Sequence, residues 1–424
     1  MENKVVWIFN HYAVTPDMSA GTRHYDFAKG LAGRGYKTTI FASSFLWGQR
    51  KELKLGKNEK HKVENFDGLN FVWVKTFPYQ KNDWRRIVNM VSYMNRAYWL
   101  GRKIAGEACG IEKPDVIIGS SVHLFAVYTA YLLSKRYKVP FIMEVRDLWP
   151  QTLIDMGVSK WHPFIILLRK LEKYLYKRAD KIITVLGGAD KYIESLGIKF
   201  NGTALVPNGV DLERFNIKET NFKNQNSLDS GFTVIYAGAI GKANNLDVVI
   251  KAAEILYKGH PDIKFLFIGD GQEKTRLSRI VKEKHLNNVK FKAPVPRKEI
   301  GGVLANADGL LFNLEDSPVF KYGISSNKLF DYLASGKPVI FSCNAANNPV
   351  EEAKAGITVS PNNPEKLASS ILKLYHMPKK QKEEMGKRGR EYVEKYHSIH
   401  VLVDKLEEVI KKVCKERKYA DTKD

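Results

Sequence analysis

The stretch YGISSNKLFDYLASGKPVI, residues 322–340, predicts a loop, a short helix and a buried strand in direct succession. Ser326 or Asn327 can cap the first amides of this helix, and Gly336 is the kind of residue that ends one. Asp331 lies one turn into the helix. An acidic residue there has a structural explanation in the helix dipole and a chemical one in ligand binding, so the rest of the chain has to decide between them.

The same succession of helix and strand recurs along the whole chain. Residues 4–10, 21–36 and 37–44 read as a buried strand, a helix and a second strand. The later predicted helices cover residues 245–258, 272–285, 297–306 and 327–335. Such alternation is typical of parallel sheets covered by helices on both faces. We therefore predict an α/β fold of two doubly wound parallel sheets with a cleft between them, and ligands at the carboxyl ends of the strands.

The length of 424 residues exceeds what one hydrophobic core usually organises, so two domains are expected. Residues 216–231 form a polar stretch with little to bury, which makes them the predicted linker region. The expected domains are residues 1–207 and residues 208–397. A helix over residues 398–424 is expected to pack back onto the first domain.

Several features predict a cytoplasmic protein. The longest apolar runs are far shorter than the roughly 18 to 20 residues of a membrane span. The opening MENKVVWIF leads directly into a strand, which does not resemble a signal peptide. Cys109, Cys343 and Cys414 are scattered without disulfide or metal spacing, as is usual in a reducing compartment.

The formal charge of +22 calls for a partner or a physical reason. Residues 1–208 contain 32 Lys and Arg against 18 Asp and Glu, so this part carries +14 of the charge. Within it, residues 79–103 and 160–181 combine basic residues with tryptophans and with apolar residues at helical spacing. Basic amphipathic helices of this kind suit an anionic membrane surface. The alternative is that the apolar stripes pack on the domain core and the charges are simply solvated.

Three loops that follow predicted strands of the second domain contain glycine or helix-start residues. They are YAGAIGKANNLD at 236–247, IGDGQEK at 268–274 and APVPRKEI at 293–300. Their glycines are Gly238, Gly241, Gly269 and Gly271. Glycine lets a backbone approach a ligand closely, and a helix that starts nearby directs its amides at an anion such as a diphosphate. Each loop alone is a weak signal, because glycine at such turns also has steric causes.

Together with VPNGVDLERF at 206–215, these loops resemble the family 4 retaining glycosyltransferases, which have the GT-B architecture. The stretch SAGTRHYDFAKGLAGRGYKTTIFASS at 19–44 looks like the first glycine loop and helix of that family. The stretch PFIMEVRDLWP at 140–150 looks like its bacterial surface-polysaccharide branch. That branch includes enzymes that add N-acetylated amino sugars such as N-acetylfucosamine.

The resemblance implies a metal-independent hexosyltransferase that uses a UDP-type nucleotide sugar. It implies a lipid-linked (polyprenyl diphosphate) saccharide of O-antigen or capsule synthesis as acceptor, met on the N-terminal domain at the inner face of the cytoplasmic membrane. The implied catalytic residues are Glu144, Arg146 and Asp147. The implied donor-binding residues are Gly21, Arg23, Gly238, Gly241, Lys242, Asn244, Gly269, Gly271, Gly323, Ser326, Asn327, Lys328, Leu329 and Asp331. For EVRDLWP, the structural alternative is that its carboxylates form ion pairs with Arg146 and its neighbours.

The sequence departs from the family pattern at the donor site. Two glutamates that the family usually has correspond to Gly323 and Asp331, of which Asp331 can still accept hydrogen bonds from ribose hydroxyls. The usual Arg and Lys against the donor phosphates correspond to Ala239 and Asn244. Lys328, like Lys242, can supply this charge instead.

Other classes of function remain as alternatives. A nucleotide-sugar epimerase of GT-B shape would act on the donor alone. A Rossmann oxidoreductase needs Gly-x-Gly-x-x-Gly after the first strand, where this chain has NHYAVTPDMSAG. A nucleic-acid binder is suggested only by the charge, and the basic excess lies largely on predicted helices. No Asp-x-Asp or His cluster indicates a metal site, and lysines with helix amides can stabilise a departing diphosphate.

Overall fold

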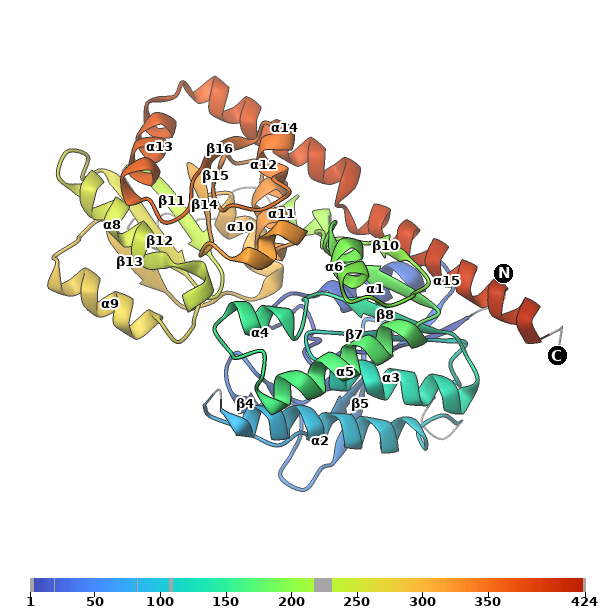
Figure 1. Ribbon diagram of the computed structural model, residues 1–424. Helices are drawn as coiled ribbons and strands as arrows, with labels where there is room; N and C mark the ends of the chain where they lie inside the picture. Colours follow the sequence, from blue (N-terminus) through green and yellow to red (C-terminus); the bar gives the residue numbers. More distant parts are fainter. Residues whose placement is uncertain (1–3, 19, 82, 107–109, 217–230, 422–424) are drawn as a thin grey trace. The chain divides into compact units, whose positions relative to one another are not determined.

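The computed structural model describes residues 4–18, 20–81, 83–106, 110–216 and 231–421. The chain divides into two compact units (Figure 1). Unit 1 comprises Met1–Thr15, Gly21–Pro207 and His400–Asp424, and unit 2 comprises Pro16–Ala20 and Asn208–Ile399. Most of the predicted linker region lies outside the described residues.

Unit 1 is built on an eight-stranded sheet with the order β10-β9-β8-β7-β1-β2-β6-β5. Its strands are β1 (Val5–Phe9), β2 (Lys37–Ser43), β5 (His61–Phe66), β6 (Leu69–Val74), β7 (Val116–Ser120), β8 (Phe141–Val145), β9 (Lys181–Thr184) and β10 (Thr203–Leu205). All neighbouring strands pair in parallel except β5 and β6, which form an antiparallel hairpin. A separate two-stranded ribbon joins β3 (Phe45–Leu46) to β4 (Lys51–Glu52).

The β5–β6 hairpin is absent from the predicted elements. Its turn contains Asp67 and Gly68, both with positive φ of 52° and 81°. An Asp-Gly pair between two extended segments favours a tight turn of this kind, so the signal was present in the sequence.

Helices cover both faces of the unit 1 sheet (Figure 1). The helices are α1 (Arg23–Ala32), α2 (Trp84–Gly101), α3 (Leu124–Tyr137), α4 (Gln151–Asp155), α5 (Pro163–Arg178), α6 (Ala189–Ser195) and α15 (Ile399–Asp421). Helix α3 packs against both α2 and α5, so these three form one layer. On α1, a Cβ at Gly30 would lie 2.5 Å from a methyl of Val403. Helix α15 therefore packs closely on α1, and Arg34 fixes it with ion pairs to Asp404 and Glu407.

Unit 2 is built on a six-stranded, entirely parallel sheet with the order β13-β12-β11-β14-β15-β16. Its strands are β11 (Phe232–Ala237), β12 (Ile263–Ile268), β13 (Val289–Lys292), β14 (Gly309–Asn313), β15 (Val339–Ser342) and β16 (Gly356–Val359). Its helices are α8 (Leu246–Tyr257), α9 (Lys274–Glu283), α10 (Ile300–Leu304), α11 (Asn327–Ala334), α12 (Pro349–Glu352), α13 (Pro364–His376) and α14 (Lys379–Tyr396), and its 3-10 turns are η2 (Leu212–Phe215), η3 (Lys242–Asn244), η4 (Arg297–Glu299) and η5 (Pro318–Tyr322).

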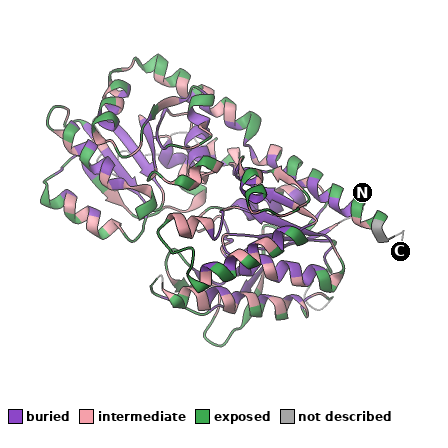
Figure 2. Ribbon diagram, in the orientation of Figure 1, coloured by how far each residue is buried: buried purple, intermediate pink, exposed green. Residues whose placement is uncertain are grey.

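Two apolar clusters form the core of unit 2, one on each face of its sheet. The first joins the sheet to α8, α9 and α13. The second joins it to α10, α11 and α14. The central strands of both sheets are almost wholly buried, the outer strands β5, β10, β13 and β16 are partly exposed, and the helices alternate between buried and exposed residues (Figure 2). The expected α/β fold of two doubly wound sheets is confirmed.

One short segment departs from the predicted division of the chain. Residues 16–20 fall within the expected first domain but group with unit 2. The reason is a backbone contact, because the Met18 carbonyl oxygen accepts a hydrogen bond from the Arg297 N–H at 3.2 Å. Within the described residues, no helix combines the length and apolar composition needed to cross a membrane.

Candidate functional site

The loops that follow β11 and β12 in unit 2 lie directly against each other. The Ile240 N–H donates to the Asp270 carbonyl oxygen at 2.8 Å. A Cβ at Gly269 would lie 1.9 Å from the Gly238 carbonyl oxygen, and one at Gly271 would lie 2.2 Å from that of Ile240. The close approach of these two loops therefore requires Gly269 and Gly271, which gives both a structural reason to be glycine.

Gly241 differs from these glycines because it faces open space. A Cβ built there meets no atom within 4 Å. It directly precedes η3, whose first residue, Lys242, is exposed. The loop thus presents unobstructed backbone at Gly241, as the predicted donor role requires.

Lys328, in the first turn of α11, has a desolvated ammonium group. It donates a hydrogen bond to the Asn244 side-chain oxygen and lies 3.2 Å from the Tyr236 hydroxyl. The ammonium also lies 4.7 Å over the ring of Tyr236 and 5.0 Å over that of Phe312. Burial lowers the pKa of Lys328 to about 7. A Cβ at Gly238 would lie 3.3 Å from the Lys328 Cδ, so the structure brings together Gly238, Asn244 and Lys328, three of the predicted donor residues.

The partners of Lys328 are neutral groups. No ion pair between Lys328 and a carboxylate occurs among the described side chains. Cys343 lies close enough to favour the charged lysine slightly, but burial raises the pKa of that thiol to about 12. The site thus holds a cation that lacks a resident anion within the part of the chain described.

The start of α11 differs from the predicted capping. Ser326 is the N-cap residue, but its side chain makes no hydrogen bond to the first amides, and Asn327 is already helical. The expectation that either side chain caps the helix is therefore wrong. Gly336 has φ of 70° just after the helix end, as a terminating glycine should. Amides at the start of a helix that lack a side-chain cap can bind an anion.

The loop before α11 is held by Asn208, which belongs to the VPNG stretch. The Asn208 N–H donates to the Ser325 hydroxyl at 2.8 Å, and its side-chain amide bonds to the Ser325 carbonyl oxygen. Gly323, in the same loop, has φ of 94°, a conformation that favours glycine. Leu329 was predicted to contact the donor, but its side chain is buried in the core of unit 2. Only the main chain of Leu329 can therefore take part in binding.

Asp331 is buried and paired with an arginine that the sequence analysis did not single out. The Arg297 guanidinium bonds to both carboxylate oxygens, with Nη2 at 2.6 Å from Oδ1 and Nη1 bonded to Oδ2. Arg297 begins η4 and lies in the APVPRKEI loop, so the loop was noted but not this residue. The predicted ribose acceptor is thus one half of an ion pair rather than a lone carboxylate.

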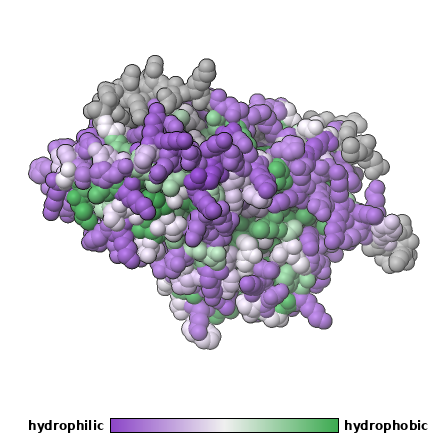
Figure 3. Space-filling view, turned by 90° about the horizontal axis from the view of Figure 1, so that it is seen from above, coloured by the Kyte–Doolittle hydropathy of each residue, from purple (hydrophilic) through white to green (hydrophobic). Residues whose placement is uncertain are grey.

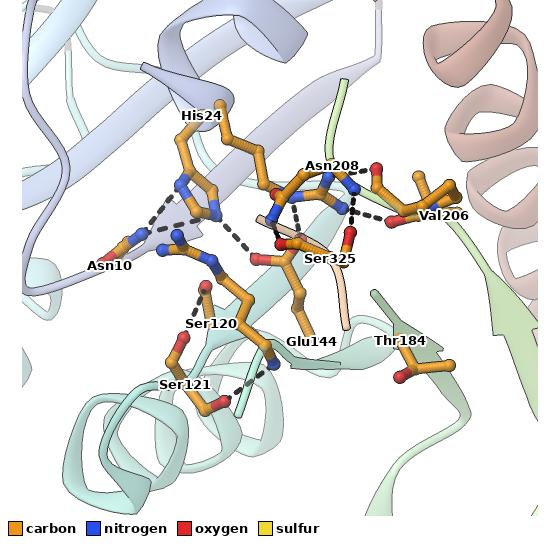
Figure 4. Close-up of polar contacts among 12 residues, drawn as sticks. Asn10, His24, Ser120, Ser121, Glu144, Thr184, Val206, Asn208 and Ser325 are labelled. Carbon is orange, nitrogen blue, oxygen red and sulfur yellow. Dashed lines mark hydrogen bonds and ion pairs between the residues drawn. The ribbon is translucent and has the colours of Figure 1, made fainter. Parts of the chain in front are cut away.

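In unit 1, Glu144 lies at the end of β8 within a buried polar network (Figure 4). Arg23 Nε donates to Glu144 Oε1 at 2.9 Å, and His24 Nε2 lies 2.6 Å from Oε2. The Arg23 Nη atoms donate to the carbonyl oxygens of Val206 and Pro207 at 2.7 and 2.6 Å. The structural alternative for Glu144 thus has support, with Arg23 and His24 as its partners in place of Arg146.

Charges and burial set the protonation of this network. Burial alone would raise the pKa of Glu144, but Arg23, His24 and Arg146 together outweigh it and hold the pKa well below its usual range. Burial lowers the pKa of His24. The Asn10 side-chain oxygen accepts from the Tyr12 N–H, so its amide nitrogen faces His24 Nδ1 at 2.7 Å. A neutral His24 then carries its proton on Nε2 and donates it to Glu144.

The other two predicted catalytic residues lie beside this network. The Arg146 N–H donates to the Ser121 hydroxyl at 3.0 Å, and burial lowers the pKa of its guanidinium (Figure 4). Asp147 accepts a hydrogen bond from the Thr152 hydroxyl at 2.7 Å, and burial raises its pKa. Gly21 is exposed just before α1. Of the three predicted catalytic side chains, Asp147 has the carboxylate that is not committed to Arg23 and His24.

Metal ligation has no structural counterpart among the described side chains. No group of three or more His, Cys, Asp or Glu residues gathers there in a way that could hold an ion.

Two family models match the chain in succession. Residues 20–214 match the model described as Glycosyltransferase Family 4, and residues 217–392 match the one described as Glycosyl transferases group 1. The putative colanic acid biosynthesis glycosyl transferase WcaI of Escherichia coli (strain K12) is 27% identical over 188 residues. This alignment covers 42% of this chain and 46% of the relative, so the match spans about half of that protein.

Solved structures resemble the chain over nearly its full length. Sucrose-phosphate synthase from Thermosynechococcus elongatus has a TM-score of 0.75 at 16% identity, over 97% of this chain and 99% of the other. HepE of Anabaena in complex with UDP-glucose has a TM-score of 0.69 at 13% identity, over 96% and 99% of the two chains. At such identities, the likeness shows the fold alone.

Proposed function

We propose that this chain, which has the GT-B glycosyltransferase fold of two Rossmann-like domains, transfers a sugar from a nucleotide donor to a lipid-linked saccharide. The donor binds to unit 2 and the acceptor to unit 1. The relatives support a role in polysaccharide synthesis, since WcaI is assigned to that of colanic acid. The transferred sugar in this proposal is an N-acetylated amino or deoxy sugar, and the product belongs to an O-antigen or capsule.

The observation that carries the proposal is the environment of Lys328. Its ammonium is desolvated among Asn244, Tyr236 and Phe312, and burial brings its pKa down to about 7. A buried cation without a counter-ion is unfavourable unless a ligand supplies the opposite charge. The uncapped start of α11 adds backbone amides at the same place. A nucleoside diphosphate satisfies both features with one group.

The nucleotide in this proposal is UDP. Structures of HepE with UDP and with UDP-glucose share the fold of this chain at 13–14% identity, and this is the support for UDP over other nucleotides. Asp331 receives the ribose hydroxyls, and Lys328 with the α11 amides holds the diphosphate. Because these groups can stabilise the leaving diphosphate, the proposed reaction needs no metal ion.

For the transfer step, we propose retention of configuration with attack on the face that the diphosphate leaves. The leaving phosphate assists removal of the acceptor proton. Asp147 is the predicted catalytic carboxylate that we assign to the acceptor, because it is partly exposed and is bonded to neither Arg23 nor His24. Glu144 is then a structural residue that fixes Arg23 and His24 at the start of α1.

The proposed setting is the inner face of the cytoplasmic membrane. The apolar residues of α2 and α5 divide into two sets. One set packs on the core of unit 1, which is what the alternative to membrane binding expects. The other set remains exposed: Trp84 is 61% exposed, Trp99 55%, Trp161 75% and Leu167 55%. On the face seen in Figure 3, most side chains are hydrophilic and the hydrophobic ones form separate small groups.

Basic residues accompany these exposed aromatics. Arg85 lies over the ring of Trp84, Arg102 over Trp99, and Lys160 over Trp161. Helix α2 and the residues just before α5 therefore combine exposed aromatic rings with positive charge, and both helices pack on α3. Anionic lipid is the surface that this combination fits.

Calorimetry with a panel of nucleoside diphosphates tests the donor site. The wild-type protein is expected to bind UDP, and the Lys328→Met variant is expected to bind it at least tenfold more weakly. Lys379→Met, at an 89% exposed side chain on α14, is a control for loss of one positive charge. Equal UDP affinity in wild type and Lys328→Met would overturn the assignment of the diphosphate to Lys328.

A further inference from the structure

The Arg297–Asp331 pair joins two elements of unit 2. Arg297 begins η4 after β13, and Asp331 lies in α11. The side chains are 10% and 4% exposed, and the guanidinium fork engages both carboxylate oxygens. The direction of the Asp331 carboxylate is therefore set by Arg297 rather than by solvent.

Further contacts hold both Arg297 and the helix that carries Asp331 in place. The Arg297 N–H donates to the Met18 carbonyl oxygen at 3.2 Å. On α11, the residue after Asp331 is Tyr332, whose hydroxyl accepts from the Ala237 N–H at 2.8 Å and donates to the Ala237 carbonyl oxygen at 3.1 Å. The ion pair thus lies between a main-chain contact and a helix anchored to β11, which leaves it little freedom to rearrange.

The chemistry of the pair suits a diol. An ionised carboxylate offers about four lone-pair sites, and a bidentate guanidinium takes one on each oxygen. One site per oxygen remains, and the two vicinal hydroxyls of a ribose can donate to them. A protonated carboxyl group would lose this capacity, because one oxygen would become a donor. A buried carboxylate without its cation takes up a proton more readily.

We propose that Arg297 is a positioning residue for the nucleotide donor, which orients Asp331 so that its remaining lone pairs receive the ribose hydroxyls. This inference rests on the proposed function, because it takes Asp331 as the ribose contact. It makes Arg297 necessary for donor affinity without direct contact between Arg297 and the nucleotide.

The other charged or titratable groups near Asp331 are few among the described residues. Lys328 lies one turn earlier on α11, and Tyr332 follows Asp331 directly. From α14, Arg390 bonds to the Ala334 carbonyl oxygen at 2.9 Å, at the far end of the helix. The pKa of Lys328 is about 7, so its charge changes within the pH range of the test. Each variant therefore has to be compared with the wild type at the same pH, where Lys328 affects UDP affinity equally in both proteins.

The test measures UDP affinity by calorimetry between pH 5.5 and 8.5 for wild type, Arg297→Gln, Arg297→Lys, Asp331→Asn and the double variant Arg297→Gln/Asp331→Asn. For Arg297→Gln, we expect a loss on the order of tenfold, because an amide cannot hold both carboxylate oxygens as the guanidinium fork does. Arg297→Lys retains a positive charge and is expected to lose only a few-fold. In the Asp331→Asn background, Arg297→Gln is expected to change little.

Three results would overturn the inference. Wild-type affinity in Arg297→Gln at every pH would show that Asp331 needs no positioning. A loss that adds in full to that of Asp331→Asn would show that Arg297 contacts the nucleotide itself. If Arg297→Gln fails to fold, a loss in Arg297→Lys that persists in full in the Asp331→Asn background would equally contradict it. Failure of the wild type to bind any nucleoside diphosphate is a separate outcome, which removes the proposed function along with this inference.

Discussion

The Lys328 ammonium lies 3.2 Å from the Tyr236 hydroxyl and 4.7 Å over the centre of the same ring. Burial removes this ammonium from water, and the desolvation lowers the pKa of Lys328 to about 7, although the aromatic face itself attracts the charged form. Tyr236 is the last residue but one of β11, so its ring lies at the carboxyl end of this strand, next to Lys328. The charge state of this lysine is the property that a bound diphosphate changes most.

Donor affinity is predicted to fall as the pH rises above about 7. A bound diphosphate favours the ammonium form and raises the pKa of Lys328 above its ligand-free value, so binding takes up a proton between the two values. The loss is at most about tenfold per pH unit between pH 7 and 9.5. Calorimetry in buffers of different ionisation enthalpy measures both the affinity and the proton uptake.

Lys328→Arg is the matched control, because a guanidinium keeps its charge throughout this pH range. Its UDP affinity is expected to vary little over the same interval. If wild type and Lys328→Arg show the same pH profile, the titrating group is not Lys328.

The glycines of unit 2 are predicted to separate into structural and ligand-facing ones. Gly269→Ala places a Cβ within 1.9 Å of the Gly238 carbonyl oxygen and should lower the free energy of unfolding by about 1–3 kcal/mol or more. Gly241→Ala meets open space and should change it by less than about 0.5 kcal/mol, while it weakens UDP binding. Urea unfolding and calorimetry on both variants test this contrast. Equal stabilities would contradict the close contact between the two loops.

Glu144 is predicted to matter more for folding than for donor binding. Glu144→Gln leaves the buried Arg23 guanidinium without its carboxylate, and loss of one partner of a buried pair costs about 3–5 kcal/mol. Chemical denaturation should show this loss, whereas UDP affinity of the folded fraction should stay near that of wild type. A stable Glu144→Gln protein with abolished transfer would instead make Glu144 catalytic.

Much of this structure was predictable because it depends on local pattern. Alternating apolar strands and amphipathic helices specify parallel layers, and the glycine at 336 specifies a helix end. The pattern of a single segment is sufficient for each of these conclusions. That Gly238, Asn244 and Lys328 lie together was implied instead by the resemblance to the family 4 glycosyltransferases, because Asn244 and Lys328 are 84 residues apart.

Side-chain partners across the fold were not predictable in the same way. Arg297 and Asp331 are 34 residues apart, and Arg23 and Glu144 are 121 apart. The residues around Glu144 in the sequence do not show whether its carboxylate will accept hydrogen bonds from Arg23 and His24 or will face a substrate. The capping of α11 failed for a related reason, because the Ser326 side chain could cap but does not in the folded chain.

Membrane binding is predicted to depend on the charge of α5 and the residues before it. Lys160→Glu/Lys170→Glu removes two exposed positive charges, one of which lies over the Trp161 ring, and should weaken sedimentation with anionic vesicles, at about 1 kcal/mol per lysine. Added salt should weaken the wild type in the same direction.

The control for this prediction is Lys379→Glu/Lys387→Glu on α14, which changes the net charge equally at side chains that are 89% and 76% exposed. It should sediment like wild type. If both double variants lose binding equally, the attraction follows net charge and not the exposed aromatic surface of unit 1.

The central claim is group transfer from a nucleotide sugar to a lipid-linked acceptor. The most direct measurement incubates the protein with a panel of UDP-sugars, with and without a short polyprenyl-diphosphate saccharide, and follows both sugars by mass spectrometry. The account predicts an acceptor enlarged by one sugar and stoichiometric release of UDP, both abolished in Lys328→Met, and no change of the donor sugar when acceptor is absent. Conversion of the donor to an isomeric nucleotide sugar without acceptor would contradict it and establish an epimerase instead.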